Sequence, residues 1–157
     1  MSAAIRTLMR LLLALAMLVA ALAIHQPAHA DSSSAPPVAS TSGTLTSGAD
    51  LYTHICQGCH MPDGQGAKGA GFYPALGGDV TLASAQYPAL IVLNGRHGMP
   101  PFGLPEEQAQ EIGGVHLSDA QIAAVVNYVR SALGNRYKDR ITEQQVAALP
   151  HPGTPAP

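Results

Sequence analysis

The chain contains only two cysteines, and both lie in the segment Cys56-Gln57-Gly58-Cys59. A single C-x-x-C pair can be a disulfide, part of a metal site or an attachment point for a cofactor. Charge is also scarce: Asp, Glu, Lys and Arg make up 11% of the sequence, and no run of Lys or Arg occurs. The mildly acidic balance argues against a nucleic-acid partner, and the missing basic run argues against a membrane-surface patch.

A long hydrophobic run occurs near the start, from Leu11 to Ile24, and it is short for crossing a bilayer core of about 30 Å, which needs about twenty residues. The run follows Arg6 and Arg10 and precedes Ala28-His29-Ala30, which is the order of a secretory signal. We predict a signal peptide over 1–30, cleaved after Ala30, and hence a periplasmic protein. Cleavage would change the net charge from −2 to −4. Retention of the segment as a membrane anchor is the alternative.

The length of 157 residues suits one folded domain. Residues 31–46 are mainly Ser, Ala, Pro, Thr and Gly, which cannot bury enough apolar surface to become ordered, so a flexible linker is expected. The domain is predicted over 47–135. A C-terminal extension over 136–157 should contain a short helix and end in a loose Pro-rich tail. No strand pattern or internal repeat emerges, so the domain is expected to be all-α.

Three polar pairs of the capping-box type predict helix starts. The pairs are Ser47 with Asp50, Ser118 with Gln121, and Thr142 with Gln145. The first helix should lead directly into Cys56, and the last should run through Leu149. The middle helix is the clearest, because apolar residues recur at helical spacing until Gly134. These are Ile122, Val125, Val126, Val129 and Leu133.

Two further segments complete the expected layout. A short helix is predicted from Pro88 to Leu93, stopped by Asn94-Gly95. Four glycines within residues 64–71 predict a loop whose backbone can turn sharply or approach a flat ligand closely.

The segment Cys56-Gln57-Gly58-Cys59-His60 is a C-x-x-C-H haem attachment pattern. Two thiols on one helical turn can each form a thioether with a haem vinyl group, and His60 is then placed beneath the iron. A thioredoxin-like redox pair and a zinc site are the alternatives. The first would want a βαβ context and a reactive thiol at a helix start, and the second would need a fourth ligand.

The second axial ligand can be sought by elimination, because removal of the signal leaves two methionines, Met61 and Met99. Met61 adjoins His60 in the chain and cannot also reach the opposite face of the ring. Met99, in the stretch Gly98-Met99-Pro100-Pro101, is therefore the predicted distal ligand, and a plain core role is its alternative. The competing side chains are His97, His54, His116, Lys68 and His151.

With these elements the chain resembles class I c-type cytochromes over Gly48–Gly134. The resemblance implies three to five helices around one covalently attached haem c, with Cys56 and Cys59 as thioether cysteines. It also implies His60 and Met99 as iron ligands, and a Pro74-Ala75-Leu76 segment. In that segment the proline carbonyl binds the proximal histidine and the leucine packs on the ring.

Further details resemble the cytochrome subunits or small partners of periplasmic dehydrogenases. The family crosses its first and last helices, which would bring Tyr52 toward Tyr128 and Val129. The shared segments are Tyr73 to Gly78, Asn94-Gly95-Arg96, Met99 to Phe102, Asn127 to Arg130, and Gly134-Asn135.

The expected function is a periplasmic one-electron carrier rather than an enzyme. It would take electrons from a dehydrogenase or quinol-oxidising complex and pass them to an oxidase or another cytochrome, meeting the membrane only through such partners if the signal is removed. A haem enzyme or ligand sensor with a labile distal ligand, and a structural subunit, are the alternatives. Partner contact is expected at an apolar haem rim with only Lys68 and Arg96 as nearby cations. The rim residues would be Met61, Pro62, Pro100, Pro101 and Phe102.

Overall fold

The structure, a computed structural model, describes residues 44–69 and 71–153. The predicted signal segment 1–30, most of the predicted linker and residues 154–157 lie outside this range. Within it, no helix is long and apolar enough to cross a membrane. The described part is mostly helical, so the all-α expectation is confirmed apart from one small hairpin.

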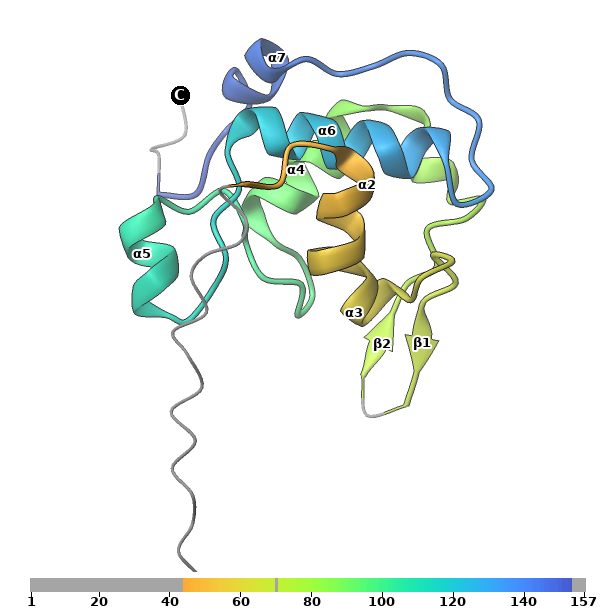
Figure 1. Cartoon of the computed structure of the whole chain (residues 1–157), viewed down its shortest axis with the longest axis horizontal. Coiled ribbons are helices and arrows are strands. Elements are labelled where there is room, and N and C mark those ends of the chain that lie inside the picture. The colour runs from red at the N-terminus through yellow and green to blue at the C-terminus, as the bar shows by residue number, and fades with distance from the viewer. Residues whose placement is uncertain (1–43, 70, 154–157) are drawn as a thin grey trace, which may run out of the picture. The chain divides into compact units, whose positions relative to one another are not determined.

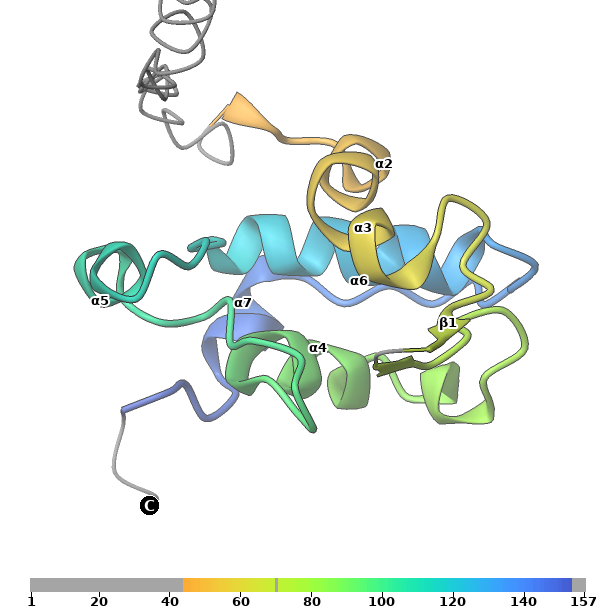
Figure 2. The same ribbon diagram turned by 90° about the horizontal axis from the view of Figure 1, so that it is seen from below.

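The elements follow one another along the chain as Figure 1 shows. In order they are α2 (Gly48–Leu51), η2 (Tyr52–Cys56), α3 (Gln57–His60), β1 (Ala67–Lys68), β2 (Phe72–Tyr73), η3 (Val80–Ala83), α4 (Gln86–Asn94), α5 (Glu106–Glu111), α6 (Asp119–Ser131) and α7 (Glu143–Ala147). Seen from below in Figure 2, α2 and α3 lie on one side of α6 and α4 lies on the other. α6 is therefore the central helix of the fold.

The first helical segment begins as predicted at Ser47, whose hydroxyl accepts the Asp50 N–H at 3.1 Å. It then passes through η2, a π-helical turn that capping and periodicity do not reveal. The segment crosses α6, and at the crossing Gly48 lies so close that a Cβ there would collide with the Ala124 carbonyl. Tyr52 meets Tyr128, with ring centroids 5.6 Å apart, as expected from the resemblance.

α6 carries the predicted capping box, in which the Gln121 N–H donates to Ser118 Oγ and the Ser118 N–H donates to Gln121 Oε1. The predicted apolar face is buried in the core cluster, with Ile122 fully buried. The expectation that Leu133 belongs to this helix is wrong. The helix ends at Ser131 because Leu133 adopts φ +53° and Gly134 φ +86°, which turns the chain back on itself.

The C-terminal extension packs against the domain. α7 has the predicted Thr142 and Gln145 capping box, and it ends at Ala147, two residues before the expected end. Ile141 and Val146 are buried in the same cluster as α6. At the other end of the described chain Leu45, within the predicted linker, also packs against this core.

Besides the π-helical turn, a hairpin, the 3₁₀ turn η3 and the helix α5 were not predicted. The glycine-rich loop and the two residues after it form the antiparallel hairpin β1–β2, in which Ala67 pairs with Tyr73, so the expectation of no strand is wrong for this short stretch. α5 forms in a segment that carries acidic residues in its first turn but no capping side chain. The predicted helix at Pro88 is present as α4 and starts two residues earlier, at Gln86.

Candidate haem site

His60 ends α3 and is 9% exposed. Its Nδ1 lies 3.1 Å from the Pro74 carbonyl, which is the contact implied by the Pro74-Ala75-Leu76 segment. When Nδ1 donates its proton to this carbonyl, Nε2 keeps its lone pair and is the nitrogen that can bind a metal. The ring is thus oriented by a backbone group fourteen residues away in sequence.

The chain turns sharply directly after His60. Met61 has φ +65°, an uncommon value for a residue with a side chain. Three hydrogen bonds hold the turn: the Tyr52 hydroxyl donates to the Met61 carbonyl at 2.7 Å, the Gly64 N–H donates to the same carbonyl, and the Gly66 N–H donates to the His60 carbonyl. Burial, with a smaller contribution from Cys56, raises the pKa of Tyr52 to about 12, so this hydroxyl remains a donor.

Cys56 and Cys59 lie one turn apart on the helical segment that ends at His60, and neither thiol is in a disulfide. Cys56 is half-buried and Cys59 is exposed. Burial raises the pKa of the Cys56 thiol to about 11, with a smaller contribution from Cys59. A thioredoxin-like pair needs a stabilised thiolate, so this environment counts against that alternative.

Met99 lies in a tight turn rather than in an unconstrained loop. The N–H of Arg96 donates to the Met99 carbonyl at 3.0 Å, and the N–H of Met99 donates back at 2.9 Å. Between them His97 and Gly98 have φ +48° and +93°, the signs that a two-residue type I′ turn requires. The sequence signal for this turn is weak, because the usual pairs are Asn-Gly, Asp-Gly and Gly-Gly, and His97-Gly98 retains only the glycine.

The chain after Met99 is fixed to the end of α4. The N–H groups of Phe102 and Gly103 donate to the carbonyls of Val92 and Leu93, two of the groups that a helix leaves unpaired at its C-terminus. Gly95 permits this return, because a Cβ there would lie 2.5 Å from the Met99 carbonyl oxygen. Met99 itself is half-buried and packs against the core.

Comparison with known proteins gives the family. Residues 45–133 match the model of the family described as Cytochrome c. The chain belongs to the cytochrome c family.

Three relatives illustrate the range of similar proteins. The fructose dehydrogenase cytochrome subunit of Gluconobacter japonicus is 39% identical over 61% of this chain and 20% of its own length. The alcohol dehydrogenase (quinone) cytochrome c subunit of Komagataeibacter europaeus is 32% identical over 80% of this chain and 27% of its own length. Cytochrome c-552 of Thermus thermophilus is 35% identical over 58% of this chain and 71% of its own length. The chain thus spans about a fifth to a quarter of the dehydrogenase subunits and most of the small cytochrome.

As a cytochrome c, this protein binds haem c covalently and serves electron transfer. The residues described above fit that group. Two unpaired thiols stand one turn apart, and the adjacent imidazole has Nδ1 directed to a carbonyl and Nε2 as its remaining donor atom. Within residues 44–69 and 71–153, no three His, Cys, Asp or Glu side chains cluster as a metal site, so the zinc alternative has no support there.

The side chains that compete with Met99 as the distal ligand of the cytochrome make contacts of their own or are exposed. Nδ1 of His54 lies 2.8 Å from the Asp50 carbonyl, and Nδ1 of His116 lies 2.6 Å from the Leu104 carbonyl. His151 Nε2 lies 2.8 Å from Asp119 Oδ1, and the hydrogen bond to this carboxylate raises the pKa of His151. The side chain of His97 is exposed at the apex of the Met99 turn, and Lys68 is exposed in β1.

The predicted rim needs one correction. Pro62 and Pro100 are exposed, and Met61 and Pro101 are half-buried. Phe102 is buried, because its backbone is tied to α4 and its ring joins the core cluster. The Arg96 guanidinium donates to the Tyr87 hydroxyl and lies 6.0 Å from the centre of that ring.

Proposed function

We propose that Cys56 and Cys59 form the thioethers to haem and that His60 and Met99 are its iron ligands. The observation that carries this assignment is the His60–Pro74 hydrogen bond, which leaves Nε2 as the metal-binding nitrogen of a buried imidazole that directly follows Cys59 in the chain. The assignment of Met99 is supported by its position on a different part of the fold from His60. Met99 lies in the turn after α4, whereas His60 ends α3 on the other side of α6. Leu76, half-buried two residues beyond Pro74, is proposed to pack on the ring.

When bound, the haem supplies a centre that gains and loses one electron at a time. The chain's own residues set the conditions for that exchange. The Pro74 carbonyl keeps the His60 ring in one tautomer, and a thioether ligand from Met99 favours the reduced state. The apolar side chains at the rim leave a surface that a redox partner can approach closely.

We further propose that the protein is an exported electron carrier without substrate chemistry of its own. The signal-like order of residues 1–30 supports export to the periplasm. The similarity to cytochrome subunits of fructose, alcohol and gluconate dehydrogenases supports a dehydrogenase as the electron donor. An oxidase or a second cytochrome would be the acceptor.

The test is an optical spectrum of protein exported together with a haem-attachment system. We expect covalent haem in alkaline pyridine and, in the ferric form, the weak far-red band of methionine bound to iron. Covalent haem without that band, together with strong carbon monoxide binding by the ferrous form, would favour a ligand sensor or haem enzyme. Absence of covalent haem would overturn the assignment of Cys56 and Cys59.

A further inference from the structure

Asn135 is a buried side chain whose amide joins two parts of the chain that are far apart in sequence. It is 7% exposed, and its Nδ2 donates to the carbonyls of Leu76 at 3.0 Å and of Val129 at 2.9 Å. Its Oδ1 accepts the Gly78 N–H at 2.9 Å. Both amide protons and the carbonyl oxygen are thus used, linking the end of α6 to residues 76–78.

A tight turn after α6 directs the Asn135 side chain toward these backbone groups. The N–H of Asn135 donates to the Ala132 carbonyl at 2.8 Å, and the two residues between them have the positive φ angles that end α6. The side chain therefore returns along the helix end, where it pairs the otherwise free carbonyl of Val129.

The segment that Asn135 holds is the one that orients His60. Pro74, whose carbonyl faces His60 Nδ1, lies two residues before Leu76 and is itself exposed. Before Pro74, Tyr73 is paired with Ala67 in the hairpin. Beyond Pro74, the N–H groups of Leu76 and Gly77 donate to the Gly64 carbonyl at 2.7 and 3.4 Å, and the Asn135 amide holds Leu76 and Gly78. A change at Asn135 thus reaches His60 through the backbone of residues 74–78.

We infer that Asn135 is a positioning residue that fixes the strength of the His60 ligand through the Pro74 carbonyl. This inference rests on the proposal that His60 binds the haem iron. A histidine whose Nδ1–H is hydrogen-bonded is a stronger donor to a metal. Without the Asn135 amide the Pro74 carbonyl is less firmly held, so the bond to Nδ1–H weakens, the ferric state loses stabilisation and the reduction potential rises.

The experiment compares Asn135→Ala with Asn127→Ala in the holoprotein. Asn127 is a matched control because it is also a buried asparagine of the α6 region, 5% exposed, and its amide pairs with both backbone groups of Ile141 in the C-terminal extension. Both variants should lose thermal stability. Only Asn135→Ala should raise the reduction potential and speed exchange of the His60 Nδ1–H, by about tenfold if that bond opens locally.

Two quantities are measured: the reduction potential of the haem, and the exchange rate of the His60 Nδ1–H, which NMR follows in the ferrous protein. Equal potentials and exchange rates in Asn135→Ala and wild type, or the same shifts in Asn127→Ala, would overturn the inference. If Asn135→Ala yields no holoprotein, Asn135→Val keeps a neutral side chain of comparable size while removing both donors and the acceptor, and it should shift both readouts in the same direction. A wild-type protein without an iron-bound His60 would instead overturn the proposed function, which separates the two failures.

Discussion

At the scale of single residues, the two methionines near the attachment motif are distinguished by where the backbone places them. Met61 directly follows His60, and its carbonyl is occupied by the Tyr52 hydroxyl. Met99 lies in a turn in which its backbone is hydrogen-bonded to that of Arg96, so the position of its Cα is fixed. A ligand presented by a rigid turn needs little reorganisation when the iron changes its oxidation state.

Met99→Ala should therefore retain covalent haem and lower the reduction potential. We expect a fall on the order of 0.1 V, within the range of roughly 0.8 V that axial ligands span. The far-red band should disappear and ferrous carbon monoxide binding should strengthen. Met61→Ala is the matched control and should keep the band. An unchanged potential in Met99→Ala would show that another group binds the iron.

At the scale of elements, the crossing of α2 over α6 depends on the missing side chain of Gly48. A Cβ there would meet the Ala124 carbonyl and lie 2.7 Å from Tyr128 Cβ, and the carbonyl, being backbone, cannot move away alone. The same crossing places Tyr52 against Tyr128 and thereby the turn that follows His60. The close packing of α2 on α6 and the orientation of the helical segment that ends at His60 therefore depend on the same contact.

Gly48→Ala should destabilise the holoprotein by about 1–3 kcal/mol, the usual cost of overpacking, despite the higher helix propensity of alanine. Gly58→Ala is the control, because Gly58 is also helical and a Cβ there meets nothing within 4 Å. The free energies of unfolding can be measured in denaturant, with haem content checked in both proteins. Equal stability of the two variants would mean that the crossing can relax.

The contact between the C-terminal extension and α6 should depend on pH. The hydrogen bond to Asp119 is the largest cause that raises the pKa of His151, so protonated His151 binds better in the folded state. Its contribution is fully present below the unfolded pKa near 6.5 and is lost as pH rises through the higher folded value. Because both side chains are partly exposed, we expect less than about 1 kcal/mol.

The measurement is the free energy of unfolding against pH for wild type and His151→Ala. The difference between them should be largest in mild acid and shrink as the pH rises. His54→Ala is the control, since His54 contacts only its own helical segment through the Asp50 carbonyl among the hydrogen bonds found for it. A difference that grows toward alkaline pH would contradict a raised pKa of His151 in the folded protein.

What the sequence could reveal at this scale was local. Two of the three predicted capping boxes are present, at Ser118 and Thr142, because each depends only on residues three apart in sequence. At Ser47 only the N-cap bond forms, and the Asp50 carboxylate accepts from the Ser47 hydroxyl instead of pairing with its N–H. The π-helical turn at Tyr52–Cys56 and the end of α6 before Leu133 were missed, since both depend on how those segments pack against others. Likewise the contact of His60 with Pro74 followed from a family resemblance, whereas the bond from Asn135 to Leu76 spans 59 positions and has no local signal.

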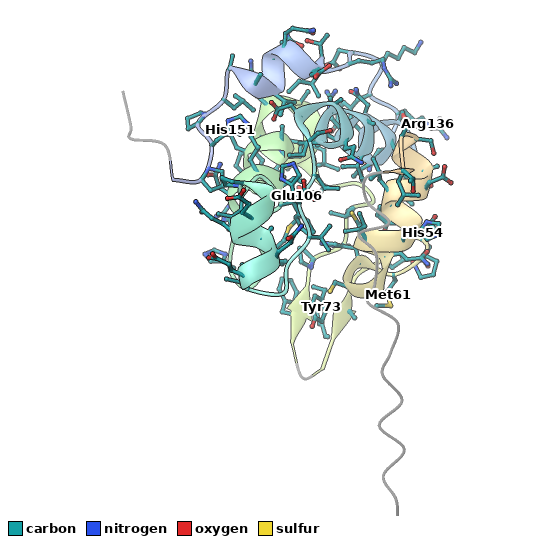
Figure 3. All side chains as sticks on the ribbon, turned by 60° about the vertical axis from the view of Figure 1, so that its left-hand side comes forward. His54, Met61, Tyr73, Glu106, Arg136 and His151 are labelled. Carbon is teal, nitrogen blue, oxygen red and sulfur yellow. The ribbon has the colours of Figure 1, made fainter. Side chains whose placement is uncertain are left out.

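At the scale of the whole molecule, acidic side chains gather on α5 and basic ones on the segment that follows α6, where Asp139 is paired with Arg130. Glu106, Glu107 and Glu111 lie on α5, while Arg136, Lys138 and Arg140 follow the end of α6. In Figure 1, α5 lies near the beginning of α6, whereas the 132–142 segment leaves the other end of α6 and runs back along that helix to α7; Figure 3 labels Glu106 and Arg136 apart from each other. The proposed rim lies in neither group, because Pro62 and Pro100 are uncharged and Arg96 is engaged with Tyr87.

Electron exchange should consequently depend only weakly on ionic strength. Charge-steered partners lose roughly 10- to 1,000-fold in association rate as salt screens their attraction, and we expect less than about tenfold here. The test is the bimolecular rate of electron exchange with a soluble cytochrome of net positive charge, from low to high salt, followed by stopped flow. Arg96→Gln should change the salt dependence little, because it removes a single exposed cation from a rim whose other side chains are mostly uncharged. A steep fall with salt that is abolished by replacing Glu106, Glu107 and Glu111 with glutamine would place the docking surface on α5 instead of the apolar rim.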